Sequence, residues 1–189
     1  MMNRSEIPFT SQFELFYEKL SGNGLLLCSL DEDGRPNPMT IGWALLGIVW
    51  RRPICAVMVR PSRYTYGCME ATGDFTVNVP PESLAAEVLF CGTESGRDYD
   101  KFEECNFTAL ESAKVQSSGI DDCLVTYECR VVQKNDVAPE HFIPEISQTL
   151  YAEGDFHRVY YGEVLSVSGD LQRIEAEQTR QAEETDDER

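Results

Sequence analysis

The chain has 189 residues, of which 42% are hydrophobic, and this length is typical of one domain. Its formal net charge of −17 opposes binding to nucleic acid, because affinity for a phosphate backbone comes largely from Lys and Arg. The sequence contains no apolar run of about 18 residues and no apolar signal-peptide core near its start. We therefore expect a single-domain cytoplasmic protein without a membrane span.

The cysteines are seven in number and include no Cys-x-x-Cys pair, which argues against a full disulfide framework and against a zinc ribbon. We expect reduced thiols that pack as small apolar side chains, with one reactive thiol as the alternative. The positions are Cys28, Cys55, Cys68, Cys91, Cys105, Cys123 and Cys129.

Short runs rich in β-branched and aromatic residues, bounded by Gly, Pro and Asp, predict a mainly β protein. The expected strands cover 25–30, 39–46, 54–60, 75–79, 122–133 and 158–167. In the run 122–133, apolar and polar side chains alternate, as they do in a strand with one face on a core.

Two helices are expected between these strands. Ser62 is a candidate N-cap for a helix over 63–71, and Pro81 can begin a second helix that ends near Gly92. The segment 137–153 is expected to be a long connection. Because strands and helices do not alternate regularly, the pattern favours a closed or partly closed β-barrel with helical insertions over a doubly wound sheet.

The composition changes at the end of the chain. Residues 170–189 contain eight acidic and three basic residues, so we expect a tail that buries no apolar face, as a frayed helix or a disordered segment. An interaction tail is the alternative. The folded domain is expected to cover 1–169.

Common catalytic motifs are absent from the sequence. The segment 92–96 has the glycines of a hydrolase nucleophile elbow, but Ser95 lies one position late. No phosphate-binding P-loop and no dinucleotide-binding glycine motif occurs. His141 and His157 are too few for a histidine-rich metal site, so no metal is expected.

Two clusters of cationic and hydroxyl residues stand out in this acidic chain. The segment 60–65 places two arginines and two hydroxyl groups at the start of the first expected helix, where free backbone N–H groups favour an anion. The segment 95–102 adds Arg97 and Lys101 beside Gly96. We interpret the two clusters as a phosphate site; surface ion pairs with Asp98 and Asp100 are the alternative.

Five segments together resemble the flavin reductase-like family, particularly its flavoredoxin branch. They are 37–43 (NPMTIGW), 60–66 (RPSRYTY), 75–80 (FTVNVP), 91–102 (CGTESGRDYDKF) and 154–164 (GDFHRVYYGEV). Their order and spacing match together, and the block 95–102 is the most specific part. The resemblance covers roughly residues 20–169.

The resemblance implies a split β-barrel that binds FMN at a homodimer interface. Such a protein would pass electrons from NADH or NADPH through the flavin to an acceptor, which could be free flavin, ferric iron or a protein. One alternative is a flavoredoxin-like electron carrier that has no nicotinamide site of its own. Another is a non-catalytic barrel.

The resemblance also implies roles for particular residues. The isoalloxazine ring would lie along Met39, Thr40 and Ile41, with Trp43 beside it. The phosphate would be held by Ser62 and Thr65, and its charge would be balanced by Lys101 together with Arg60 or Arg63. The ribityl or ring atoms would be contacted by Asn78, Ser95, Gly96 and Arg97. Trp43 could instead be an ordinary core aromatic residue.

His157 is the one candidate catalytic residue, because many relatives carry a histidine near the flavin at this place. The alternative is a partly exposed histidine at the start of a strand. General acid or base catalysis is not strictly required, since hydride transfer to a flavin is the chemistry of the cofactor.

Overall fold

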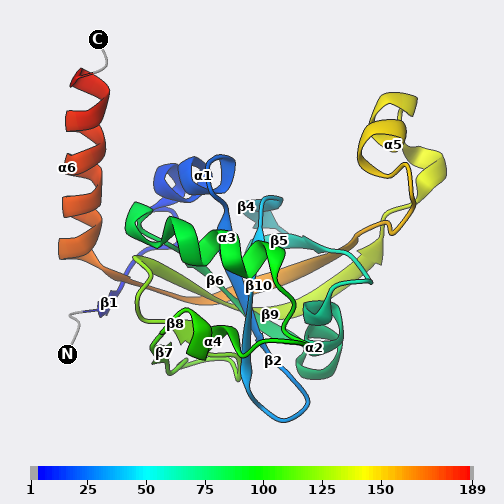
Figure 1. Ribbon diagram of the computed structural model, residues 1–189, viewed down its shortest axis with the longest axis horizontal. Helices are drawn as coiled ribbons and strands as arrows, with labels where there is room; N and C mark the ends of the chain where they lie inside the picture. Colours follow the sequence, from blue (N-terminus) through cyan, green and yellow to red (C-terminus); the bar gives the residue numbers. More distant parts are fainter. Residues whose placement is uncertain (1–3, 188–189) are drawn as a thin grey trace.

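The computed structural model describes residues 4–187, in which eight strands form one antiparallel sheet in the order β3-β2-β6-β9-β10-β5-β4, with β1 paired to β10 (Figure 1). The strands are β1 (Arg4–Glu6), β2 (Leu25–Leu30), β3 (Pro36–Ile41), β4 (Ala44–Val49), β5 (Arg52–Val59), β6 (Asp74–Val79), β9 (Val125–Asp136) and β10 (Arg158–Asp170). A separate hairpin joins β7 (Ala109–Leu110) to β8 (Gly119–Ile120). The last two large strands begin near the expected positions and continue beyond the expected ends.

The link between β3 and β4 closes the sheet. These two strands lie at opposite ends of the strand order, yet only Gly42 and Trp43 separate them in the chain. The three Cα–Cα steps from Ile41 to Ala44 reach at most about 11 Å, so the sheet has to roll until its edges approach one another. The prediction of one continuous strand over 39–46 is therefore wrong, because the chain leaves one edge at Ile41 and enters the other at Ala44. We call this junction the seam.

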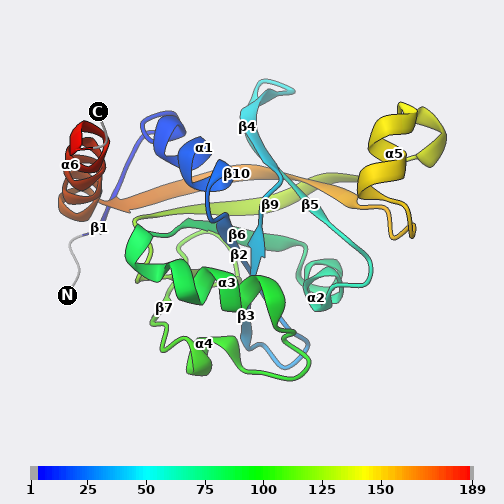
Figure 2. The ribbon, with the colours of Figure 1, turned by 45° about the horizontal axis from the view of Figure 1, so that its top comes forward.

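Two apolar clusters flank the strands, and β2 contributes to both. Leu25 and Leu27 belong to the main core inside the rolled sheet, whereas Leu26 and Cys28 belong to the second cluster. This is the two-residue alternation of a strand that is buried on both faces. Figure 2 shows α3 (Ala85–Thr93) and α4 (Lys101–Glu104) on one side of the strands and α1 (Phe13–Ser21) on the other.

The helices are arranged to cover these clusters. α3 (Ala85–Thr93), which follows the 3₁₀ turn η1 (Glu82–Leu84), and α4 (Lys101–Glu104) bury Val88, Cys91 and Phe102 in the second cluster. α1 (Phe13–Ser21), which the sequence did not predict, buries Leu15 and Phe16 in the main core.

The helix expected over 63–71 is α2 (Tyr64–Thr72), but its expected cap is wrong. Arg63 occupies the N-cap position, and no side chain accepts a capping hydrogen bond there. The Ser62 hydroxyl donates to the Asp155 carboxylate, so it is turned away from the helix end.

The long connection contains ordered structure that the sequence did not predict. η2 (Pro139–His141) and α5 (Pro144–Leu150) form an arm that extends away from the sheet (Figure 1). The rings of Phe142, Tyr151 and Phe156 stack on one another, with centroid distances from Tyr151 of 5.2 and 4.8 Å. Aromatic stacking therefore helps to order this segment, together with the contacts of Tyr151 to Trp43 and Arg60 of the barrel.

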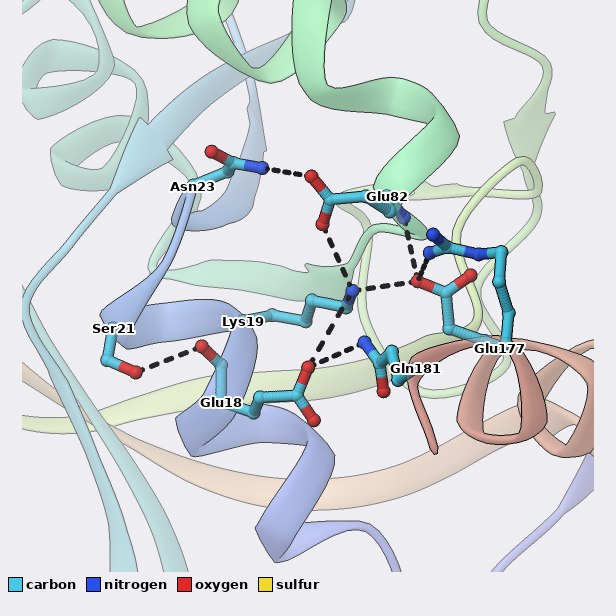
Figure 3. Close-up of polar contacts among 8 residues, drawn as sticks. Glu18, Lys19, Ser21, Asn23, Glu82, Glu177 and Gln181 are labelled. Atoms are coloured by element: carbon cyan, nitrogen blue, oxygen red, sulfur yellow. Dashed lines mark hydrogen bonds and ion pairs between the residues drawn. The ribbon is translucent and has the colours of Figure 1, made fainter. Parts of the chain in front are cut away.

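The acidic end of the chain is a helix, α6 (Leu171–Asp187), rather than a disordered tail. The expectation that it buries no apolar side chain is wrong at Ile174, which is 3% exposed and belongs to the main core. A buried polar contact also joins the helix to the rest of the fold: Lys19 of α1 donates to Glu177 of α6 at 2.7 Å and to Glu82 at 3.3 Å (Figure 3).

Glu177 completes this contact. Its carboxylate also accepts the Glu82 backbone N–H at 2.8 Å and is only 8% exposed. Burial raises the pKa of this carboxyl, but the hydrogen bonds from Lys19 and Glu82 lower it by more, so the pKa lies below its ordinary value.

Two general features complete the fold. None of the helices in residues 4–187 combines the length and apolar character needed to cross a membrane. All seven cysteines are free thiols, and six of them are buried.

We predict that Lys19→Met lowers the free energy of unfolding by about 3 kcal/mol, because the buried Glu177 carboxylate loses its buried cation and keeps only the partly exposed Arg180. Urea denaturation measures the change. Glu18→Ala is the matched control: its carboxylate is 48% exposed and lies 3.9 Å from Lys19, so its loss should cost less than about 1 kcal/mol. Equal effects of the two variants would contradict the assignment.

Candidate functional site

A cavity of about 180 Å³, the seam cavity, lies where the two edges of the sheet meet. Residues 39–43, Met58, Arg60, Arg63, Gly92 and His157 line it. The side chains of Met39 and Ile41 point into the main core, while the Thr40 hydroxyl donates to the Val88 carbonyl of α3. Among the described strands β3 pairs only with β2, so its other edge has no strand partner, although the Pro38 carbonyl accepts from Lys101. At this place the protein therefore presents backbone rather than side chains.

A second cavity of about 140 Å³, the anion cavity, adjoins the first. The two share Met39, Arg63 and Gly92. The anion cavity lies between the start of α2, the end of α3 and the loop 94–100. The structure thus brings the two cationic clusters of the sequence, 60–65 and 95–102, to one place.

Lys101 is a buried cation that lines the anion cavity. It is 4% exposed, and its Nζ donates to the carbonyls of Pro38 at 3.1 Å and Cys91 at 2.9 Å. Among the side chains that the structure describes, no carboxylate lies within ion-pair distance of this ammonium group, which leaves its third proton for a ligand. Burial lowers the pKa of Lys101. An anion in the cavity would offset the cost of burying this charge.

The start of α2 supplies further donors to the anion cavity. The first N–H groups of a helix have no partner within the helix, and its dipole favours an anion there. Thr65 is 2% exposed, and its Oγ1 accepts a hydrogen bond from Nδ2 of Asn37 at 2.9 Å, so its own hydroxyl proton can be donated elsewhere. Arg63 is exposed, lines both cavities and makes no ion pair with the described part of the chain.

The loop 95–97 forms the opposite wall. A Cβ at Gly96 would lie 2.0 Å from Oδ1 of Asn37 and 2.7 Å from the Tyr64 ring, so only glycine permits this close approach. The Arg97 guanidinium lies 5.5 Å from the centroid of the Tyr64 ring and donates to the Ser62 carbonyl at 3.3 Å. The Ser95 hydroxyl accepts the Arg97 backbone N–H at 3.2 Å, which fixes the turn.

One predicted site residue lies elsewhere. Asn78 is fully buried in β6 and lines neither the seam cavity nor the anion cavity. Its amide nitrogen donates to Leu26 and Thr76, and its oxygen accepts from Ile120 and Thr126. Asn78 therefore lies apart from the other predicted site residues, and its polar atoms hold neighbouring segments of the barrel wall together.

Arg60 and Ser62 reach the cavities but already have partners. The Arg60 guanidinium donates to the carbonyls of Leu150 at 3.0 Å and Asp155 at 2.9 Å and lies over the Tyr151 ring. The Asp155 carboxylate accepts both the hydroxyl and the backbone N–H of Ser62. These two residues fix the arm and the loop before β10, which leaves Arg63 as the accessible cation of the cluster 60–65.

His157 lies in the wall of the seam cavity beside Trp43, and their ring centroids are 4.7 Å apart. It is 8% exposed, so it is a buried residue rather than a partly exposed one. Its Nδ1 lies 2.7 Å from the Tyr151 hydroxyl. Burial, together with the positive charges of Arg60 and Arg63, lowers its pKa to about 4. The imidazole is therefore neutral at pH 7.

Three functional residues were missed from the sequence. Asn37 orients Thr65, Tyr151 holds His157, and Asp155 holds Ser62. Asn37 and Asp155 lie within the segments that carry the family resemblance, and this position could have marked them as candidate site residues. Tyr151 lies in a connection with no strand or helix pattern and gave no signal.

Comparison with known proteins assigns the family. A family model described as "Flavin reductase like domain" matches residues 19–180. The chain belongs to the flavin reductase-like family. A protein of Archaeoglobus fulgidus described as uncharacterized is 31% identical over 134 residues, which cover 71% of this chain and 66% of that protein. The chain thus spans slightly less than two thirds of this relative's length.

Solved structures of the family share the fold. Flavoredoxin of Desulfovibrio vulgaris (Miyazaki F) superposes with a TM-score of 0.62 at 23% identity, over 77% of this chain and 68% of that one. An FMN-binding domain of a flavin reductase-like enzyme from Shewanella baltica gives a TM-score of 0.64 at 19% identity, over 90% and 78%. The expected split β-barrel and the resemblance to this family are both confirmed.

We predict that the His157 ring titrates with a midpoint near pH 4, below the ordinary value of 6.5. Proton NMR of the two histidines measures it, with His141→Gln to assign the signals. Because the unfolded chain binds this proton more readily than the folded one, His157 makes the fold less stable as the pH falls from 6.5 towards 4. A midpoint near 6.5 would show that the ring is not buried as described.

Proposed function

We propose that this protein is an FMN-binding oxidoreductase, and the observation that carries the proposal is the buried Lys101 ammonium group, which has no anionic partner among the described side chains. Lys101 lines the same cavity as the start of α2, with Arg63 and Arg97 close by, and this arrangement is suited to a phosphate. The flavoredoxin and flavin reductase-like structures that share the fold support FMN as the molecule that carries this phosphate.

The described residues suggest how FMN would be held. Lys101, Arg63, Arg97 and Thr65 would surround the phosphate in the anion cavity. The free edge of β3 would offer backbone groups to the isoalloxazine ring in the seam cavity, with Trp43 beside it. When bound, FMN supplies the capacity to accept a hydride and pass electrons onward.

His157 acts as a neutral group in this proposal. Its lowered pKa makes it a hydrogen-bonding partner, rather than a cation, for a molecule in the seam cavity. Tyr151 holds the ring through Nδ1, so the other ring nitrogen is the one left for that molecule.

We further propose that NADH or NADPH reduces the bound flavin and that free flavin, ferric iron or an acceptor protein receives the electrons in the cytoplasm. The free thiols support a reducing compartment. The likeness to flavoredoxin favours a second candidate, an electron carrier that a separate reductase serves.

The second copy of the chain would complete the site. The two adjoining cavities, of about 180 and 140 Å³, together lie only at the lower limit of the roughly 300–1,000 Å³ of ligand pockets. The edge strand β4, which follows Trp43, exposes Leu45 (67%) and Ile48 (66%), and Trp50 after it is 58% exposed. We propose a homodimer through this apolar edge.

Light scattering should give the mass of two chains, and the mass of one chain would refute the proposal.

We predict that Lys101→Met weakens FMN binding about tenfold to a hundredfold, because a charged hydrogen bond to phosphate is lost. Arg63→Ala, at an exposed residue, should weaken binding about tenfold and keeps the test valid if the first variant folds poorly. Flavin fluorescence titration measures both. Lys114→Ala removes the same charge outside the cavities and should leave the affinity unchanged; unaltered affinity in both site variants would refute the phosphate site.

We expect the FMN-loaded protein to oxidise NADH or NADPH steadily, measured by the loss of nicotinamide absorbance with free FMN or ferric iron as acceptor. Protein that binds FMN but oxidises neither nucleotide would exclude the reductase and leave the electron carrier. Protein that does not bind FMN would exclude both candidates.

A further inference from the structure

Two of the seven free thiols lie close together beside the anion cavity. The sulfur atoms of Cys91 and Cys105 are 3.9 Å apart. Cys91 lies near the end of α3, lines the anion cavity and is 1% exposed, whereas Cys105 directly follows α4 and is half-buried. A disulfide has a sulfur separation of about 2.05 Å, so the two sulfurs have to approach by about 1.9 Å. Rotation of the two side chains and small shifts of the helix ends can supply this movement.

Both cysteines also hold Lys101 in place. The Cys91 carbonyl accepts a hydrogen bond from Nζ of Lys101 at 2.9 Å, and the Cys105 backbone N–H donates to the Lys101 carbonyl at 3.1 Å. The segment 92–104 between the two cysteines includes Lys101 and the loop 95–97, which line the anion cavity. A bond between the two sulfurs would therefore close this segment into a ring that carries one wall of the cavity.

The thiols of the chain differ in their access to an oxidant. Burial raises the pKa of both Cys91 and Cys105, and the positive charge of Lys101 lowers both in part. Because peroxides react with the thiolate, oxidation is expected to be slow and to begin at Cys105, which solvent reaches. A second pair, Cys55 and Cys129, interacts in the core, but both residues are fully buried, so a peroxide does not reach them.

We propose that a peroxide converts Cys91 and Cys105 into a reversible disulfide. With hydrogen peroxide, the Cys105 sulfur attacks one oxygen: an S–O bond forms, the O–O bond breaks, and water leaves with the thiol proton. The Cys91 sulfur then attacks the Cys105 sulfur: the S–S bond forms, the S–O bond breaks, and a second water leaves with the Cys91 proton. The two thiols lose two electrons and the peroxide gains them. A dithiol reductant reverses the change.

The disulfide prepares the anion cavity for its ligand. A bond that joins the ends of 92–104 restricts the motion of this segment before a phosphate arrives, so less ordering accompanies binding. The oxidised protein therefore binds FMN more tightly than the reduced protein, and FMN in turn favours the disulfide by the same factor. This consequence rests on the proposed FMN site, whereas the formation of the disulfide does not.

The first experiment treats the full chain with hydrogen peroxide and maps the product by mass spectrometry. The expected product has lost two hydrogen atoms, contains a peptide in which Cys91 is joined to Cys105, and returns to its starting mass with dithiothreitol. Cys55→Ala, which removes the rival pair in the core, should give the same product. Cys105→Ala should not, and Cys91→Ala replaces it if that variant folds poorly. Oxidation that does not join Cys91 to Cys105, or that joins Cys55 to Cys129 equally, would overturn the proposal.

The second experiment compares FMN affinity before and after oxidation, by fluorescence titration once the peroxide has been removed. The unmodified protein should bind FMN about threefold or more tightly when oxidised, which is the effect of ordering one side chain in advance. Cys105→Ala treated in the same way should keep its affinity, which separates the disulfide from oxidation of methionine. Unchanged affinity of the disulfide form would refute the coupling to the anion cavity. If FMN binds neither form, the proposed function fails and the coupling with it, while the peptide map still decides the disulfide.

Discussion

The two residues between β3 and β4 set the constraint on which the rest of the structure depends. Gly42 and Trp43 join strands at opposite ends of an order of seven strands, so the described sheet has to roll until its edges meet. The same junction leaves the outer backbone groups of β3 without a strand partner and places Trp43 beside His157. The junction that closes the barrel therefore also forms the seam cavity.

Electrostatics then distinguish the two cavities. The chain carries a net charge of −17, yet Lys101, Arg63 and Arg97 gather around the anion cavity, and the hydrogen bonds of Lys101 within the described residues go to two carbonyl oxygens. In the seam cavity, burial and the neighbouring arginines keep His157 neutral by lowering its pKa. One end of the site therefore favours a phosphate, and the other favours an uncharged ring with polar edges.

The sequence predicted the parts of the fold that local patterns determine. The strand expected over 25–30 is β2, and the alternation over 122–133 marks most of β9. The two cationic clusters line one cavity, as the family resemblance implied when it assigned Thr65 and Lys101 to the same phosphate. The role of Asn78 could not be predicted, because its partners Ile120 and Thr126 lie more than 40 residues away in the chain. The order of the arm depends on aromatic stacking across the connection, which has no periodic pattern.

The central claim is that the buried charge of Lys101 is completed by the phosphate of a flavin nucleotide. The most direct test compares FMN with riboflavin, which has the same ring and ribityl chain but no phosphate, in fluorescence titrations of the unmodified protein. The account predicts that FMN binds at least about tenfold more tightly than riboflavin, because charge-assisted hydrogen bonds to the phosphate are lost with riboflavin. Equal affinities for the two flavins would contradict it.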